Sequence, residues 1–314
     1  MREVCVAGNQ IRKDYLLDRY VIVAENRGAR PHDFVQQSPP SEKGKTCFFC
    51  PGNEHLTPPE TGRIGTAKKW LVRSFYNKFA AVSKDFPEAR GSHEVLVETP
   101  SHTKQLGQVS ERQIGLTLLL CQKRVSALCK DPKIKYVLVF KNQGPKAGTS
   151  LLHSHSQIIA TEFVPSSVEE ELRAYKKEKS CPFCAIARRE AKSERRIFED
   201  RHFIAFAPYA SRSAFEVWVM PKRHVKCITG LTAAERSSLA KMIKRLLARL
   251  KSLFKYPQFN YYFHIAPKGE DFHFHMELLP RLTIWAGFEL GSGMYINPVS
   301  PENAAGMLRK AKGF

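Results

Sequence analysis

The chain has 314 residues, 43% of them hydrophobic, and its 50 basic and 30 acidic residues give a formal net charge of +20. This length and apolar content suffice for one large or two ordinary folded domains, which argues against a disordered chain. The sequence has neither an apolar signal-like N-terminus nor an apolar run of about eighteen residues, so we expect a cytoplasmic protein without a membrane partner. The charge favours polyanions or phosphorylated substrates.

The first half of the chain predicts strands around one helix. A polar linker over residues 36–46 precedes a tight Cys-x-x-Cys turn at 47–53, and residues 110–129 have the apolar period of a helix. Alternating or apolar runs predict strands at 20–24, 70–74, 80–83, 93–98, 136–140 and 151–160.

A glycine-bearing loop over residues 142–150 leads into the last of these strands. Gly144 and Gly148 allow backbone N–H groups to approach a ligand closely, and Ser150 adds a hydroxyl donor. This composition is typical of a phosphate-binding loop.

Two histidines and a glutamine follow the loop at two-residue spacing, as His153, His155 and Gln157. Side chains at this spacing share one face of a strand, where imidazoles and amides are costly to bury without partners. A neutral imidazole, with an ordinary pKa of about 6.5, can attack a phosphorus atom. Glutamine can donate a hydrogen bond to phosphate but cannot shuttle a proton, which favours group transfer over hydrolysis.

The second half of the chain repeats this order. It has a Cys-x-x-Cys turn at 181–184, and a long amphipathic helix is predicted at 233–254. Strands are predicted at 203–207, 215–220, 261–265 and 272–279.

Matching landmarks indicate an internal duplication. Glu94-Val-Leu-Val aligns with Glu216-Val-Trp-Val, and each half ends in a His-x-His pair. We therefore predict an α+β protein of two tandem strand-helix-strand repeats, each an antiparallel sheet with a packed helix. The predicted division lies between residues 1–165 and 166–314.

Each repeat offers two cysteines and two later histidines. The sets are Cys47, Cys50, His102 and His153, and Cys181, Cys184, His224 and His273. Two thiolates and two imidazoles complete a tetrahedral zinc site without an open position, which predicts two structural zinc ions.

Other readings of the same residues remain open at this point. The cysteines would be reduced thiols in turns beside unrelated histidines, or one pair would be a redox Cys-x-x-Cys. In the second set, His202 or His264 would serve as a ligand instead.

The motifs resemble the galactose-1-phosphate uridylyltransferase family, whose members are duplicated relatives of the histidine triad fold. The resemblance spans nearly the whole chain. It is carried by His-Ser-His-Ser-Gln at 153–157 and by segments 11–14, 27–31, 47–54, 73–79 and 287–297.

The resemblance implies a role for each matching position. His155 would be the nucleophile that becomes nucleotidylated, Gln157 would bind its phosphate, and both cysteine-histidine sets would hold zinc. The implied substrate-binding residues are Arg27, Arg30, Asn77, Asn142, Gly148, Ser150, Gly287, Phe288, Glu289 and Gly291. The segment containing Gly287 would contact the hexose, often across the interface of a homodimer.

The implied reaction is a ping-pong exchange of UMP between UDP-glucose and galactose 1-phosphate. An alternative is an adenylyltransferase similar to ADP-glucose phosphorylase, because these motifs do not identify the base or the sugar. The charge and the two zinc sets also suit a less favoured alternative, a zinc-stapled nucleic-acid-binding protein.

The second repeat is predicted to be non-catalytic. Its loop over residues 266–271 carries two acidic side chains, which would repel a phosphate. His275, the counterpart of His155, is either a buried strand histidine or a phosphate ligand.

Overall fold

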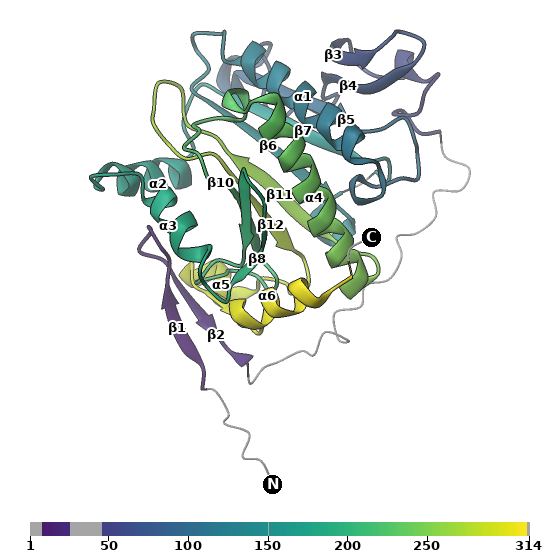
Figure 1. The fold of residues 1–314 in the computed structure, drawn as a ribbon. Coiled ribbons are helices and arrows are strands. Elements are labelled where there is room, and N and C mark those ends of the chain that lie inside the picture. The colour runs from purple at the N-terminus through teal and green to yellow at the C-terminus, as the bar shows by residue number, and fades with distance from the viewer. Residues whose placement is uncertain (1–7, 26–45, 150, 313–314) are drawn as a thin grey trace.

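The protein, seen here as a computed structural model, is described for residues 8–25, 46–149 and 151–312 (Figure 1). Its largest element is a ten-stranded sheet with the order β3-β4-β5-β7-β6-β11-β12-β10-β9-β8. All neighbours in this sheet are antiparallel. Its N-terminal strands are β3 (Glu60–Gly65), β4 (Trp70–Tyr76), β5 (Gly91–Val97), β6 (Tyr136–Gln143) and β7 (His155–Thr161). Its C-terminal strands are β8 (Arg196–Glu199), β9 (Phe203–Phe206), β10 (Val217–Pro221), β11 (Phe259–His264) and β12 (His275–Pro280).

The strand order shows the predicted duplication as a mirrored sequence of strands. Each half contributes five strands, and β6 pairs with β11 at the centre, where Phe259 faces Gln143 and Phe263 faces Val139. The predicted α+β class with two repeats is confirmed. The two sheets expected from the sequence are joined into one, because the inner edge strand of each repeat completes its hydrogen bonds with the other.

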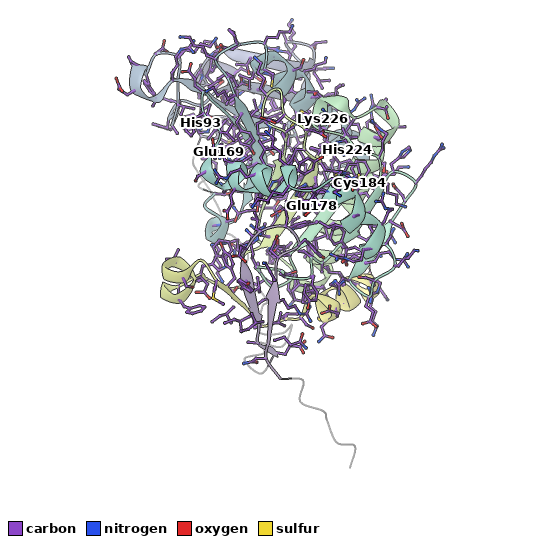
Figure 2. The ribbon with its side chains drawn as sticks, turned by 90° about the vertical axis from the view of Figure 1, so that its left-hand side faces the viewer. His93, Glu169, Glu178, Cys184, His224 and Lys226 are labelled. Carbon is purple, nitrogen blue, oxygen red and sulfur yellow. The ribbon has the colours of Figure 1, made fainter. Side chains whose placement is uncertain are left out.

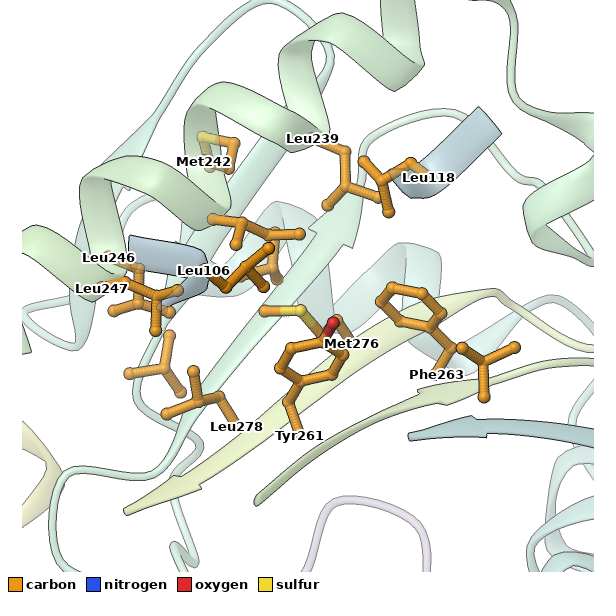
Figure 3. Packing of buried hydrophobic residues seen from close by; sticks show 14 of the residues in the cluster. Leu106, Leu118, Leu239, Met242, Leu246, Leu247, Tyr261, Phe263, Met276 and Leu278 are labelled. Atoms are coloured by element: carbon orange, nitrogen blue, oxygen red, sulfur yellow. The ribbon is translucent and has the colours of Figure 1, made fainter. Parts of the chain in front are cut away.

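Two long helices, α1 (Glu111–Leu128) and α4 (Ala233–Phe254), pack together on one face of this sheet. In α4, Thr232 and Glu235 form a capping box in which each side chain bonds the other's backbone N–H. Leucines of α4 face Tyr261 and Met276 of the central strands (Figure 3). Burial of each such leucine contributes about 1.5–3 kcal/mol, so this layer is the main core.

The opposite face of the sheet is covered differently in the two halves. In the C-terminal half, Ile204 and Trp218 pack under α2 (Ser166–Lys176) and α3 (Pro182–Glu190). In the N-terminal half, Val95 and Val97 pack against Phe49 of the first cysteine turn. On this one face, equivalent positions of the two halves therefore have different surroundings.

The N-terminal hairpin packs on the C-terminal half of the chain. Strands β1 (Gln10–Lys13) and β2 (Tyr20–Val23) pair antiparallel, and β2 pairs parallel with β13 (Tyr295–Asn297). Between β1 and β2, Tyr15 lies edge-on to Trp218, with ring centroids 5.8 Å apart. The short helix α5 (Gly287–Ser292) precedes β13, and α6 (Pro301–Lys310) packs on β8.

Three predicted strands need correction. Residues 80–83 form a turn, because the Ala81 N–H bonds a histidine ring instead of a neighbouring strand. Residues 151–154 lie outside β7, since His153 turns toward the first cysteine pair and the Leu152 carbonyl accepts from Gln105. For the same reason β12 begins only at His275, after the equivalent ligand of the second pair.

The part of the linker at 36–45 lies outside the described residues. Among the described helices, none combines the length and apolar character needed to cross a bilayer.

Candidate active site and metal centres

His155 is the first residue of β7, and its two ring nitrogens have different surroundings. Its Nδ1 lies 2.9 Å from the carbonyl oxygen of His153, so Nδ1–H donates and the lone pair stays on Nε2. The ring lies edge-on to Phe49 at 5.4 Å between centroids. Burial lowers the pKa of His155 to about 4, with Lys141 as the next cause. A neutral, half-buried imidazole with a free Nε2 lone pair is a nucleophile at neutral pH.

The loop after β6 is built from left-handed glycines. Gly144 has φ 88° and Gly148 has φ 85°, and a Cβ on Gly144 would lie 2.4 Å from Gln258. Between them a short 3-10 turn, Pro145–Ala147, is closed by the Ala147 N–H to the Gly144 carbonyl at 3.0 Å. In its described part the loop turns on these glycines, but its backbone N–H groups at 146–149 donate within the protein, to Gln258 Oε1 and to the carbonyls of Gly144 and Pro145. The phosphate-binding role of the loop therefore stays a prediction. Ser150 lies outside the described residues.

The amide of Asn142 is oriented by the second repeat. Asn260 of β11 donates from Nδ2 to Asn142 Oδ1 at 2.8 Å and to the Ala147 carbonyl at 2.9 Å. Because its oxygen is engaged, Asn142 presents its NH2 group as the available donor. A strand of one repeat thus supports the loop of the other, which sequence reasoning did not anticipate.

Gln157 and Asn77 meet at His93 of β5. Gln157 Oε1 lies 2.8 Å from His93 Nε2, and Asn77 Nδ2 lies 3.1 Å from the same nitrogen. Val95 pairs with Gln157 in the sheet, so His93 reaches Gln157 diagonally. The sequence analysis missed His93, although it shares its strand face with Val95 and Val97.

A buried ion pair lies beneath the nucleophile. Lys141 Nζ is 2.8 Å from Glu98 Oε2, and it also donates to the His155 carbonyl at 3.0 Å. The hydroxyls of Ser154 and Ser156 donate to the same carboxylate. Burial by itself would raise the pKa of Glu98, but Lys141 and the serines hold it below its usual range. This network fixes the backbone on both sides of His155.

The first set of predicted metal ligands converges. The Nδ1 atom of His153 lies 3.5 Å from Cys47 Sγ and 3.7 Å from Cys50 Sγ, and His102 Nδ1 is 3.5 Å from Cys50 Sγ. Tetrahedral zinc bonds place sulfur and nitrogen roughly 3.5 Å apart. The Thr99 carbonyl, 2.7 Å from His153 Nε2, accepts a hydrogen bond from Nε2–H, which leaves the Nδ1 lone pair for a metal. The donor set therefore fits zinc, which would tie the cysteine turn to β7.

The second set converges in the same way. His273 Nδ1 lies 3.5 Å from Cys181 Sγ and 3.4 Å from Cys184 Sγ, and His224 Nδ1 is 3.8 Å from Cys184 Sγ. The outer nitrogen of His224 bonds Asp271 at 2.9 Å. Cys184 and His224 lie side by side in Figure 2, well apart from His93. Neither His202 nor His264 joins the set that the structure brings together.

His275 has the backbone arrangement of His155 in closed surroundings. Its Nδ1 also lies 2.9 Å from the carbonyl of the preceding ligand, His273. It is 1% exposed, stacks on His264 at 4.3 Å and faces Glu277 at 3.6 Å. These residues form a third compact group of possible ligand atoms. Burial alone would lower the pKa of His264, but Glu171 and Glu277 raise it to about 10, as expected for an imidazolium held by ion pairs.

Of the remaining predicted substrate residues, those that the structure describes lie away from His155. Arg27 and Arg30 lie outside the described residues. Gly287, Phe288, Glu289 and Gly291 belong to α5, which contacts β13. Figure 1 shows α5 at the lower end of the molecule, away from β5 and β7. On α5, Phe288 is half-exposed, and the neighbouring Leu290 is 77% exposed.

Comparison with known proteins gives two family matches and several full-length relatives. Residues 5–165 match the family model "Galactose-1-phosphate uridyl transferase, N-terminal domain", and residues 180–280 match "Scavenger mRNA decapping enzyme C-term binding". The chain is 33% identical to an ADP-glucose phosphorylase of Arabidopsis thaliana, covering 96% of this chain and 92% of that protein. It is 32% identical to a galactose-1-phosphate uridylyltransferase of Thermotoga maritima, covering 96% and 98%. A crystal structure of the Arabidopsis thaliana enzyme with bound ADP-glucose superposes with a TM-score of 0.86 at 31% identity, covering 97% of this chain and 99% of that one.

Proposed function

Because the chain belongs to the galactose-1-phosphate uridylyltransferase family, we propose that it transfers a nucleotidyl group from a nucleoside diphosphate hexose through a covalent adduct on His155. The observation that carries this proposal is that His155 is half-buried, whereas His275 is 1% exposed, and that the Nδ1–H of His155 bonds the His153 carbonyl. This bond leaves a neutral Nε2 lone pair on the strand that follows the glycine loop.

In the first half-reaction, Nε2 attacks the α-phosphorus and forms a P–N bond. The bond from that phosphorus to the bridging oxygen breaks, and hexose 1-phosphate leaves as an anion that requires little protonation. The NH2 groups of Gln157 and Asn142 would donate to phosphate oxygens as charge builds on them. In the second half-reaction, an acceptor phosphate attacks the adduct and restores His155.

UDP-glucose with galactose 1-phosphate as acceptor is the first substrate pair that we propose. The full-length uridylyltransferase relative at 32% identity supports it. ADP-glucose with inorganic phosphate as acceptor is the second candidate, and the ADP-glucose phosphorylase relative at 33% identity supports it about equally.

Intact-protein mass spectrometry separates these candidates. The protein is incubated with UDP-glucose or ADP-glucose alone, and His155→Gln serves as the control. We expect one uridylyl or one adenylyl group per chain, lost again when galactose 1-phosphate or phosphate is added. Folded, metal-replete protein that forms neither adduct would overturn the mechanism, and steep salt-dependent binding to RNA or DNA would then favour the nucleic-acid alternative.

We also propose that the protein works as a homodimer with two zinc ions per chain. The segment of Gly287 forms α5, which lies away from β7 within one chain (Figure 1), so it would reach the hexose of the partner subunit. A mixture of His155→Gln and Leu290→Asp chains should then regain activity that neither variant has alone. If activity returns neither when the two variants are mixed nor when they are co-expressed, the proposal of a shared site is contradicted.

A further inference from the structure

His93 is a buried histidine beside the catalytic strand, and neither metal set includes it. Figure 2 labels its side chain. His93 lies on β5, is 7% exposed, and by the alternation of a strand shares its face with Val95 and Val97. Histidines are costly to bury unless their ring nitrogens have partners. The identity of those partners shows which nitrogen carries the proton.

The backbone N–H of Ala81 points at His93 Nδ1 from 3.1 Å. A backbone N–H can only donate, so Nδ1 must be the acceptor nitrogen and the ring proton must sit on Nε2. Nε2–H then needs an acceptor, and Gln157 Oε1 at 2.8 Å provides one. Asn77 does not supply this acceptor. Its amide nitrogen, 3.1 Å from Nε2, is a donor, because Asn77 Oδ1 accepts from the Phe79 N–H at 2.9 Å.

We propose that His93 is a positioning residue that fixes the amide of Gln157 with its oxygen inward and its NH2 group toward the phosphate on His155. This inference rests on the proposed function. Within the described residues, the side chain of Gln157 has His93 as its hydrogen-bonding partner, and its NH2 group stays available to donate to a phosphate.

The orientation matters because the two ends of an amide have opposite polarity. An NH2 group stabilises the negative oxygens of a pentavalent phosphorus, whereas an amide oxygen in the same place repels them. Burial lowers the pKa of His93, with the Gln157 bond opposing the shift, so the ring keeps the neutral form in which Nδ1 can accept. The Ala81 bond also ties the turn after β4 to this arrangement.

Replacement of His93 by leucine and by glutamine tests the proposal. Leucine fills the buried space without a donor, whereas glutamine places an N–H near the position of Nε2. The readout is the single-turnover rate of adduct formation at saturating nucleotide sugar, alongside metal content and thermal stability. We expect His93→Leu to lower this rate roughly tenfold to a hundredfold, below the loss of about 100- to 1,000-fold that removal of a transition-state donor costs. His93→Gln should regain most of the rate.

A double-mutant cycle with Gln157→Ala separates positioning from a general structural effect. If His93 acts through Gln157, His93→Leu should change the rate less than twofold in the Gln157→Ala background. Equal losses in both backgrounds would overturn the proposal, as would a His93→Leu protein that is folded, metal-replete and fully active. Absence of any adduct on the unmodified protein would instead contradict the proposed function itself.

Discussion

The two halves of the sheet place a His-x-His pair at equivalent positions, yet the second histidine of each pair has different surroundings. In both pairs, the first histidine lies against two cysteines. Its backbone carbonyl accepts a hydrogen bond from Nδ1–H of the second histidine. His155 is half-buried on the strand that follows the glycine loop, on the same strand face as Gln157. Nε2 of His275 faces Glu277 under α3, at a site lined also by Tyr15 and Trp218. The two histidines share the same strand geometry. They differ in the access to Nε2 and in the charge around it, and this difference separates the proposed nucleophile His155 from the core residue His275.

Exchange of each second histidine for glutamine should give the largest difference between the halves. His155→Gln is expected to lower adduct formation by roughly 10⁴-fold or more, because no other group replaces the nucleophile. His275→Gln should keep a wild-type adduct in the folded fraction and lose about 1–3 kcal/mol of unfolding free energy, since its buried partners lose a bond. Mass spectrometry and chemical denaturation measure the two effects. An adduct that persists in the first variant would place the nucleophile elsewhere.

Removal of one metal from each half should affect stability in both but chemistry mainly in one. Cys50→Ser and Cys184→Ser are each expected to reduce the metal content from two ions to one per chain, because a tetrahedral set loses a thiolate. Only the first should also slow adduct formation in folded protein, since His153, a proposed metal ligand, also accepts the hydrogen bond from His155 Nδ1–H. Elemental analysis with single-turnover kinetics tests this. Equal rates in both variants would show that the first zinc does not support the nucleophile.

The ion pair under His155 gives a third comparison. Lys141→Met leaves Glu98 as an uncompensated buried carboxylate and should cost roughly 3–5 kcal/mol of unfolding free energy. The exposed Lys123→Met is a matched control on the same half, expected to stay within about 0.5 kcal/mol. Denaturant titration compares them. Similar stabilities would mean that Glu98 is protonated or reached by water once Lys141 is removed.

The smallest effect is expected for a substitution in the second repeat that tests whether this repeat supports the candidate active site of the first. Asn260→Ala removes the donor that fixes Asn142, and loss of one such bond should slow adduct formation about threefold to tenfold. Asn303→Ala, which removes an exposed amide on α6 of the same half, should leave the rate unchanged. If both variants react at the wild-type rate, the loop does not depend on β11.

Features that depend on residues close together in the sequence were predicted well, and most features that depend on distant residues were not. The helix at 233–254 was predicted with its observed bounds, because its caps and apolar stripe are local. Both ligand sets were found, since cysteine and histidine are few and their order repeats. The strand predicted at 80–83 was wrong, because the Ala81 backbone N–H bonds the ring of His93, twelve residues further along the chain, and not a neighbouring strand.

By itself the sequence determined the duplication and the residues of the two candidate metal sets, and it led to the prediction of His155 over His275, because these follow from residue types and spacing along the chain. The tertiary structure decided the fusion into one sheet, the burial of His275, and the contacts of His93, Lys141 and Asn260. These depend on pairs far apart in the sequence, and a strand pattern alone does not specify which polar atoms meet across a sheet. The orientation of an amide, on which we expect the transfer chemistry to depend, is a property of such pairs.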